Sequence, residues 1–382
     1  MEADKLMALV EVFEGLEDWR NAQQTRHRLD ELLTVAVCAV LSGADDFEDI
    51  SQWGKEKLDW LRRFLTLDYG VASSDIFERV FALLDPKSFE RAFRSWVAMV
   101  IPALGHEQVI AIDGKSSRRT TSKAAAAPLH LVSAFAAEVG VVLGQVATHE
   151  KSNEITAIPE LLGVLDIKDC IVTIDAMGTQ TAIARTIRER GAHYVLCVKD
   201  NHPTLLDSIL LTHAGVAGPL EAASTCETRS RGHGREEVRL CQAFEADARL
   251  YKAEQWPDLR SLATVKRTRI VGGKKSVERR HYISSLPPDA DKIAHAVRSH
   301  WEVENRLHWC LDVQFSDDYA RARTGHVAHN MALVRHIALN LIRLNTSRKA
   351  SIKTKRLLAA TSDEYRAELL GFEPQDEEEA DD

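Results

Sequence analysis

The chain has 382 residues, of which 45% are hydrophobic, so it is long enough to bury a sizeable core in more than one domain. The sequence has neither a signal-peptide pattern nor an apolar run of about 18 residues, which predicts a cytoplasmic protein without a membrane span. Its six cysteines form no C-x-x-C pair and are expected to be reduced thiols rather than disulfides or zinc ligands.

The formal net charge of -8 does not exclude nucleic-acid binding, because it is unevenly distributed along the chain. The segment 373–382 carries seven acidic residues and no basic ones, so the rest of the chain is close to neutral. Basic residues gather in 114–123, 266–280 and 343–356. Such clusters are compatible with DNA binding, which needs local positive charge, and equally with ordinary solvated surface. The acidic tail is expected to be disordered.

Residues 1–103 are predicted to form a helical domain. The run 27–44 has a long apolar face and ends at Gly43, and Asp75 followed by Glu78 has the pattern of a capping box. The tryptophans of this region, Trp53, Trp60 and Trp96, are expected to pack in its core.

The hydrophobic period then changes from that of helices to that of strands. Three successive strands followed by alternating helices and strands predict an α/β fold with a mixed sheet flanked by helices. The predicted strands are 107–113, 129–138, 141–150, 170–175 and 193–199, and the predicted helices are 155–165, 179–190 and one from Pro203.

Residues 222–288 alternate in short polar segments with a hairpin turn at Gly272 and Gly273, which indicates a β-rich insertion. Helix resumes near Asp291 and passes through Glu304, and the apolar run 331–344 follows. The predicted domains are 1–103, a core in two parts (104–221 and 289–348), the insertion 222–288, and a basic segment with an acidic tail (349–382).

Two aspartates stand at the ends of apolar strands. Asp113 follows an apolar run from Val109, and Asp175 ends the run CIVTID. A carboxylate in that position is unfavourable unless it is paired or holds a metal ion. Ligands collect at strand ends in open sheets, and oxygen ligands without thiolates favour magnesium or manganese. The two aspartates are therefore candidate metal ligands.

A third acidic residue lies on the predicted helix. His300, Glu304 and His308 share one face at i, i+4 spacing. A solvated face with hydrogen-bonded histidines explains this pattern as well as a functional site does. A zinc site from the same residues is disfavoured because no H-E-x-x-H is present.

Long motifs in a fixed order carry a family resemblance. They are AIDGKSSRR around Asp113, KSNEITAIPELL from Lys151, VTIDAMGTQ around Asp175, YVLCVKDNH from Tyr194, GHGREEVR from Gly232 and HWEVENRLHWCLDVQFSDD from His300. With them the chain resembles bacterial insertion-sequence transposases of the DDE class, which have an RNase H-like core, and most closely the H-repeat-associated group.

This resemblance implies a DNA-binding role for the helical domain 1–103. It also implies a catalytic triad of Asp113, Asp175 and Glu304, with the β-rich insertion between its second and third members. The triad would bind two Mg²⁺ or Mn²⁺ ions and cleave and join DNA strands at the ends of the element. The implied partners are double-stranded DNA, as terminal inverted repeats and as target, and a second copy of the chain in a nucleoid-associated homodimer. A remnant that only binds DNA and a host nuclease without strand transfer are the alternatives.

The neighbours of the triad are candidates for contacts with phosphate, although each is equally explained as a surface residue. These candidates are Lys115, Arg118, Arg119, Lys151, Asn153, Lys199, Arg235, Arg321 and Arg323, and His300, Asn305 and His308 are candidate supporting residues. Glu154 is explained more simply as a helix-start carboxylate. The sequence departs from the family's pattern at Val297, His300 and Leu311, where related transposases often have tyrosine, arginine and lysine, and at His202.

Overall fold

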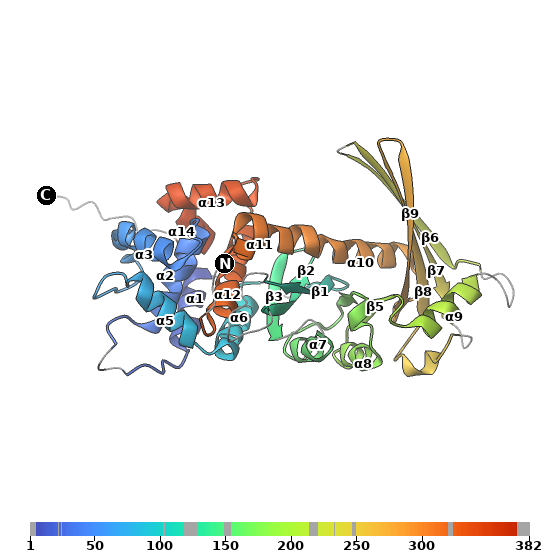
Figure 1. Ribbon diagram of the computed structural model, residues 1–382, viewed down its shortest axis with the longest axis horizontal. Coiled ribbons are helices and arrows are strands. Elements are labelled where there is room, and N and C mark those ends of the chain that lie inside the picture. The colour runs from blue at the N-terminus through green and yellow to red at the C-terminus, as the bar shows by residue number, and fades with distance from the viewer. Residues whose placement is uncertain are drawn as a thin grey trace.

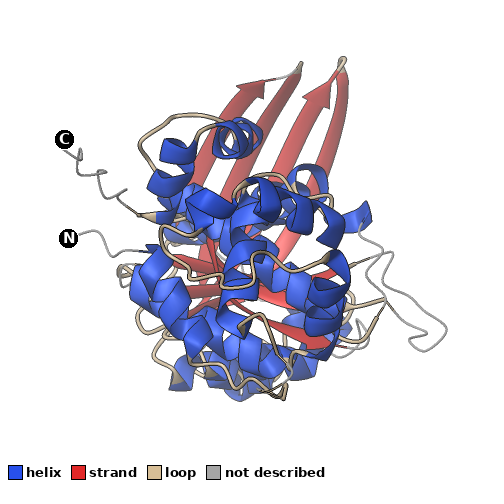
Figure 2. Ribbon diagram, turned by 90° about the vertical axis from the view of Figure 1, so that its left-hand side faces the viewer, coloured by secondary structure: helices blue, strands red, loops and turns tan. Residues whose placement is uncertain are grey.

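The computed structural model describes residues 5–21, 23, 25–101, 104–117, 128–148, 154–213, 221–232, 234–246, 250–319 and 324–372. Along its longest axis a helical lobe, a sheet covered by helices and a long β arm follow one another (Figure 1). Figure 2 shows the same molecule from the helical lobe, with the strands of the arm rising behind it.

The N-terminal part of the chain is helical, as predicted. Its helices are α1 (Lys5–Glu14), α2 (Leu29–Leu41), α3 (Phe47–Glu56), α4 (Leu58–Leu61), α5 (Ser74–Leu83) and α6 (Pro86–Val100). Every residue of α2 is buried, so the other helices surround it. Asp46 and Asp85 cap α3 and α6 by accepting backbone N–H bonds. The predicted capping box at Asp75 is wrong, because the N-cap of α5 is Ser73, two residues earlier, and its side chain makes no capping hydrogen bond.

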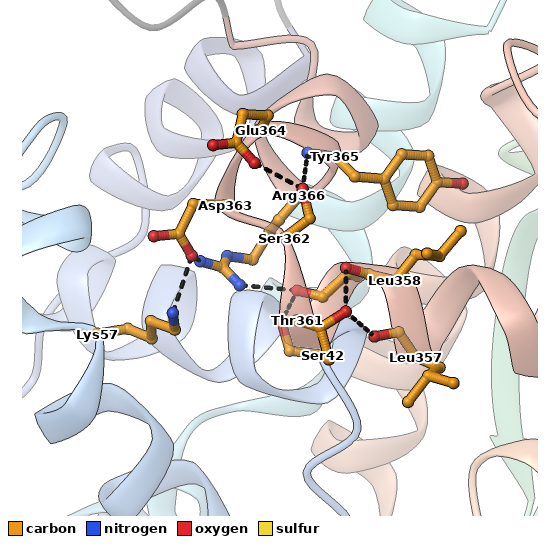
Figure 3. A network of polar contacts seen from close by, with 11 residues as sticks. Ser42, Lys57, Leu357, Leu358, Thr361, Ser362, Asp363, Glu364, Tyr365 and Arg366 are labelled. Carbon is orange, nitrogen blue, oxygen red and sulfur yellow. Dashed lines mark hydrogen bonds and ion pairs between the residues drawn. The ribbon is translucent and has the colours of Figure 1, made fainter.

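The end of the chain returns to this lobe. Helices α12 (Val327–Leu344), α13 (Ile352–Thr361) and α14 (Asp363–Leu370) pack on it, and α13 and α14 were not predicted. Arg366 is wholly buried, lies 4.1 Å from the ring centroid of Trp60 and donates to the Ala359 carbonyl at 2.7 Å. Lys57 pairs with Asp363 at 2.9 Å (Figure 3). The predicted disordered tail, 373–382, lies outside the described residues.

The central sheet confirms an RNase H-like mixed arrangement. Its strands are β1 (Val109–Ser116), β2 (His130–Ala136), β3 (Val141–Thr148), β4 (Ile171–Ile174) and β5 (His193–Val198), in the order β3-β2-β1-β4-β5. Strand β1 is antiparallel to β2 and parallel to β4. Helices α7 (Glu154–Gly163) and α8 (Thr181–Glu189) lie on one face, and the long helix α10 (Ala290–Val303) crosses the other (Figure 1).

The β-rich insertion continues this sheet. After α9 (Pro203–His213) come β6 (Ser224–Gly232), β7 (Arg235–Glu245), β8 (Ser261–Val271) and β9 (Lys274–Ser284), an antiparallel meander. Strand β9 pairs with β5, so one nine-stranded sheet runs from the core into the arm. Gly272 and Gly273 have positive φ, +53° and +77°, and confirm the predicted hairpin.

The helix that leads to Glu304 changes from an α-helix to a π-helical turn at that residue. Asp289 caps α10 with hydrogen bonds from the backbone of residues 291 and 292. At its end five residues form a π-helical turn, η4 (Glu304–His308), before α11 (Trp309–Gln314) continues. The six cysteines are free thiols, as expected. Within the part of the chain that the structure describes, no helix has both the length and the apolar character needed to cross a membrane.

Candidate functional site

Asp113 and Asp175 lie side by side at the ends of the paired parts of two parallel strands. Strands β1 and β4 pair from Val109 to Ile112, with Ile112 opposite Ile174, and each aspartate comes next in its chain. Strand β1 itself continues past Asp113, paired with β2 alone. The Asp113 side chain is 28% exposed and that of Asp175 is 52% exposed. Parallel pairing therefore brings together the two carboxylates that the sequence singled out.

Each aspartate has a nitrogen partner from elsewhere in the chain. Nε2 of His308 lies 3.0 Å from Oδ2 of Asp113, and Nζ of Lys199 donates to Oδ1 of Asp175 at 2.8 Å. Burial raises the pKa of both carboxyl groups, but His308 and Lys199 outweigh it and hold each pKa below its usual value. Both side chains are therefore ionised at neutral pH.

His300, on α10, is the third nitrogen-bearing side chain close to the aspartates. Its Nδ1 lies 3.1 Å from the hydroxyl of Thr173, which precedes Asp175 by two residues. Burial lowers the pKa of His300, although the charges of Asp113 and Asp175 act to raise it. The ring is thus neutral at pH 7. Two of the three predicted supporting residues, His300 and His308, contact or face the aspartates.

Glu304 points elsewhere. It opens the π-helical turn, is exposed, and together with Asn305 lines a cavity of about 500 Å³ between α10 and the β arm. Among the described residues, no three His, Cys, Asp or Glu side chains are arranged to hold a metal ion. The aspartate pair fits a hard divalent cation as two ionised oxygen donors. The structure does not gather Glu304 with that pair.

Lys115 is not presented to a phosphate. Its ammonium group pairs with Asp312 and, at 2.7 Å, with Asp317, and only 14% of its side chain is exposed. Both partners come from about two hundred residues further along the chain, so the sequence around Lys115 contains no sign of them. Lys199, by contrast, is 40% exposed beside Asp175.

The other predicted phosphate contacts divide into two groups. Arg235 follows a turn in which Gly234 has φ +69°, as its sequence indicates, and lines the same cavity as Glu304. Arg118, Arg119, Lys151, Asn153, Arg321 and Arg323 lie outside the described residues. At the positions of departure, Val297 and Leu311 are buried and pack in the core.

Sequence reasoning missed the arginines that surround this cavity. Besides Arg235, its wall contains Arg239, Arg267, Arg280 and Arg298. The signal available was alternation along single strands, since residues two apart on β7 and β8 share a face. Which helix covers that face was not visible from the pattern.

Comparison with known proteins gives matches over almost the whole chain. Residues 10–97 match the family described as "DDE_Tnp_1-associated", and residues 104–341 match "Transposase DDE domain". "Putative transposase YncI" of Escherichia coli O157:H7 is 37% identical over 96% of this chain and 95% of its own length. "H repeat-associated putative transposase YhhI" of Escherichia coli K12 is 36% identical over 97% of this chain and 98% of its own length. A cryo-EM structure of a piggyBac transposase synaptic complex with hairpin DNA covers 98% of this chain and 75% of its own, at 10% identity and TM-score 0.41.

Proposed function

Because the chain belongs to the DDE transposases of insertion sequences, in the H-repeat-associated group, we propose that it cuts DNA at the ends of its element and joins them to target DNA. The observation that carries the proposal is the pair formed by Asp113 and Asp175. The two carboxylates are neighbours on parallel strands, accessible and ionised.

In this proposal Asp113 and Asp175 hold the divalent ions. Glu304, which the structure does not gather with that pair, is assigned as the third catalytic acid from the family motif that begins at His300. When bound, two Mg²⁺ or Mn²⁺ ions supply activation of the attacking oxygen and stabilisation of the leaving oxygen in an in-line displacement. The π-helical turn carries both Glu304 and His308, the partner of Asp113. Such turns are frequent at functional sites.

The surrounding residues prepare the two aspartates. His308 fixes the orientation of Asp113 through its 3.0 Å contact, and Lys199 neutralises Asp175 until another cation approaches. Neutral His300 fills the space next to both without adding a competing positive charge. These three residues thus act as positioning residues.

The partners follow from the same proposal. The substrate is double-stranded DNA, first as the terminal inverted repeats and then as the target, and two copies of the chain hold two ends together. Such a protein would be associated with the nucleoid.

The direct test incubates the purified protein with Mg²⁺ and DNA carrying the repeats that flank its gene. Strand-transfer products are expected. Cleavage without joining would indicate a nuclease instead, and binding without any product would indicate a remnant that no longer transposes.

Separate variants connect the reaction to the triad. Asp113→Asn, Asp175→Asn and Glu304→Gln are each expected to lower product formation by about 10³-fold or more, since a metal site contributes several kcal/mol to the transition state. DNA binding should stay unchanged. Asp166→Asn, at an exposed position away from the strand ends, is the matched control.

A further inference from the structure

Strand β1 loses one of its two neighbours at the point where it carries Asp113. Strand β4 pairs with β1 only as far as Ile112, so the segment from Asp113 to Ser116 pairs with β2 alone among the described strands. With one neighbour instead of two, this segment has fewer backbone hydrogen bonds to fix it. The position of the Asp113 carboxylate therefore depends on the side chains that hold the segment.

The side chains of this segment alternate between the two faces of the sheet. Asp113 contacts His308, and Lys115 pairs with Asp312 and Asp317, so the first face is held by the chain that follows α10. Residues 114 and 116 belong to the opposite face, which α7 covers (Figure 1). Whatever holds that second face must come from α7 and from β2.

A line of three hydrogen-bonded side chains lies on the second face. Oγ of Ser116 is 2.7 Å from Nδ1 of His130, which is its partner in the register of β1 and β2. Nε2 of His130 is 2.6 Å from Oε1 of Glu154, the first residue of α7. A carboxylate can only accept, so Nε2 donates to Glu154 and Nδ1 accepts from Ser116. These three residues, here called the His130 relay, connect β1, β2 and α7.

The His130 relay is buried and packs directly against Gly114. His130 is 2% exposed, and the side chain of Glu154 is 12% exposed. A Cβ atom at Gly114 would lie 2.5 Å from Nε2 of His130 and closer still to the carboxylate of Glu154. The relay therefore occupies the space that a side chain of residue 114 would need, and it touches the backbone there.

The backbone of Gly114 in turn supports the Asp113 carboxylate. Burial raises the pKa of Asp113, whereas His308, His300 and then the backbone N–H of Gly114 lower it. A displacement of Gly114 would thus move both the chain that carries this carboxylate and one of the groups that stabilise its charge.

We propose that Glu154 and His130 are positioning residues that hold the backbone of Gly114 and thereby orient Asp113 toward the divalent ion. The inference rests on the proposed function, since the ion is part of it. Residues that hold metal ligands in place typically change metal affinity by about 10–100-fold when they are removed. Glu154 does not itself bind the ion in this proposal, because its carboxylate is engaged with His130 on the face opposite Asp113.

The test measures binding of Mn²⁺ to the DNA-free protein through the electron paramagnetic resonance signal of the free ion. Asp113→Asn should abolish binding, which identifies the site. Glu154→Ala should weaken binding about tenfold or more. Glu154→Gln keeps an oxygen that can accept from His130, so it should stay within about threefold of wild type. Thermal melts establish that each variant is folded.

A second buried pair of histidine and glutamate supplies the matched control. Nε2 of His329 lies 2.8 Å from Oε1 of Glu90, and the two side chains are 12% and 7% exposed. Glu90→Ala should also lower the melting temperature, because it leaves a buried histidine without its partner. Its Mn²⁺ affinity should nevertheless stay within about twofold of wild type. Equal weakening of Mn²⁺ binding by Glu90→Ala and Glu154→Ala would mean that general loss of stability is the cause, and the inference would fail.

Gly114→Ala tests the same contact without removing any polar group, and it decides the matter if Glu154→Ala does not fold. The added methyl group displaces the relay, so Mn²⁺ should again bind about tenfold more weakly. Gly163→Ala, at the end of α7, is its control, because a Cβ atom there meets nothing within 4 Å. This control should bind Mn²⁺ as the wild type does.

Unchanged Mn²⁺ affinity in folded Glu154→Ala and Gly114→Ala would overturn the inference and leave the proposed function intact, because the ion would still bind through Asp113. A loss with Glu154→Gln as large as that with Glu154→Ala would also contradict it, since the carboxylate would then act as a ligand. A wild-type protein that binds no Mn²⁺ would overturn the inference together with the metal-dependent function.

Discussion

Two clusters of charge in this protein are built differently. Close to Asp113 along the chain, Lys115 shares Asp317 with Arg335, and the two cations lie 2.7 and 2.8 Å from its oxygens. Asp312 also pairs with Lys115. In the arm, Arg235, Arg239 and Arg267 share Glu237, and Arg267 also lies 3.7 Å from Glu278. The first group, here called the Asp317 cluster, gives each cation a close carboxylate. In the cavity lined by Arg235, Arg239, Arg267, Arg280 and Arg298, here called the arginine cavity, Arg298 has no ion pair among the described residues.

The two groups differ in how burial and ion pairing combine at their cations. In the Asp317 cluster, burial opposes the charged form of Lys115 and Asp317, but each partner outweighs it, so the pKa of Lys115 is raised and that of Asp317 is lowered. In the cavity, Arg239 has its pKa lowered instead. The carboxylates therefore dominate at Lys115, whereas burial and neighbouring arginines dominate at Arg239.

The largest effect is expected in the Asp317 cluster. Asp317→Asn leaves buried Arg335 without its carboxylate and Lys115 with only one, which should lower the free energy of unfolding by about 3–5 kcal/mol. Urea denaturation measures it. Glu11→Gln, on the exposed side of α1, should change stability by less than about 0.5 kcal/mol. A loss below about 1 kcal/mol in Asp317→Asn would show that the cluster is not structural.

The pH dependence of stability tests the same cluster through His336. Burial lowers the pKa of His336 to about 3, with Lys115, His308 and Arg335 repelling its charged form and Asp317 opposing them. In the unfolded chain a histidine titrates near 6.5, so between about 6.5 and 3 the unfolded state binds the extra proton. Stability should therefore fall with falling pH, by about 1.4 kcal/mol per pH unit.

His336→Gln should remove this part of the slope, measured as the unfolding free energy at pH 6.0, 5.25 and 4.5. Asp317 does not interfere there, because its pKa is lowered, so its contribution is fully present above about 4 and is lost only at lower pH. His326→Gln, at an exposed position, is the control. Equal slopes for wild type and His336→Gln would contradict the assignment.

A comparison of Lys199 with Lys115 tests whether the exposure of a lysine ion pair determines how much the pair stabilises the fold. Its pair with Asp175 is exposed on both sides, at 40% and 52%. Lys199→Met should therefore change the free energy of unfolding by less than about 1 kcal/mol. Lys115→Met, measured by the same urea titration, should be several times more damaging. Similar losses in both would remove the distinction between them.

The smallest effect should have the opposite sign. Removing one charge from the arginine cavity relieves repulsion, so Arg298→Gln should leave stability unchanged or raise it by a few tenths of a kcal/mol. Thermal melts at low and high salt measure this. The gain should shrink as salt screens the repulsion. A clear destabilisation would mean that Arg298 has a structural partner and that the cavity is balanced.

Much of the fold was predictable because it depends on local pattern. The strands that carry Asp113 and Asp175, the hairpin turn at Gly272 and the order of helices and strands all follow from hydrophobic period and glycine placement. The capping box at Asp75 failed because the residue types do not determine the backbone geometry that starts this helix two residues earlier, after Ser73.

What the sequence by itself determined is the identity and order of the acidic residues, the mixed sheet and the family. What only the tertiary structure decided is which charges meet. Lys115 pairs with Asp317, and Glu304 lies in the wall of the arginine cavity, because strands and helices from distant parts of the chain pack together. Whether a charge is neutralised or left unbalanced depends on such long-range neighbours, and local sequence does not encode them.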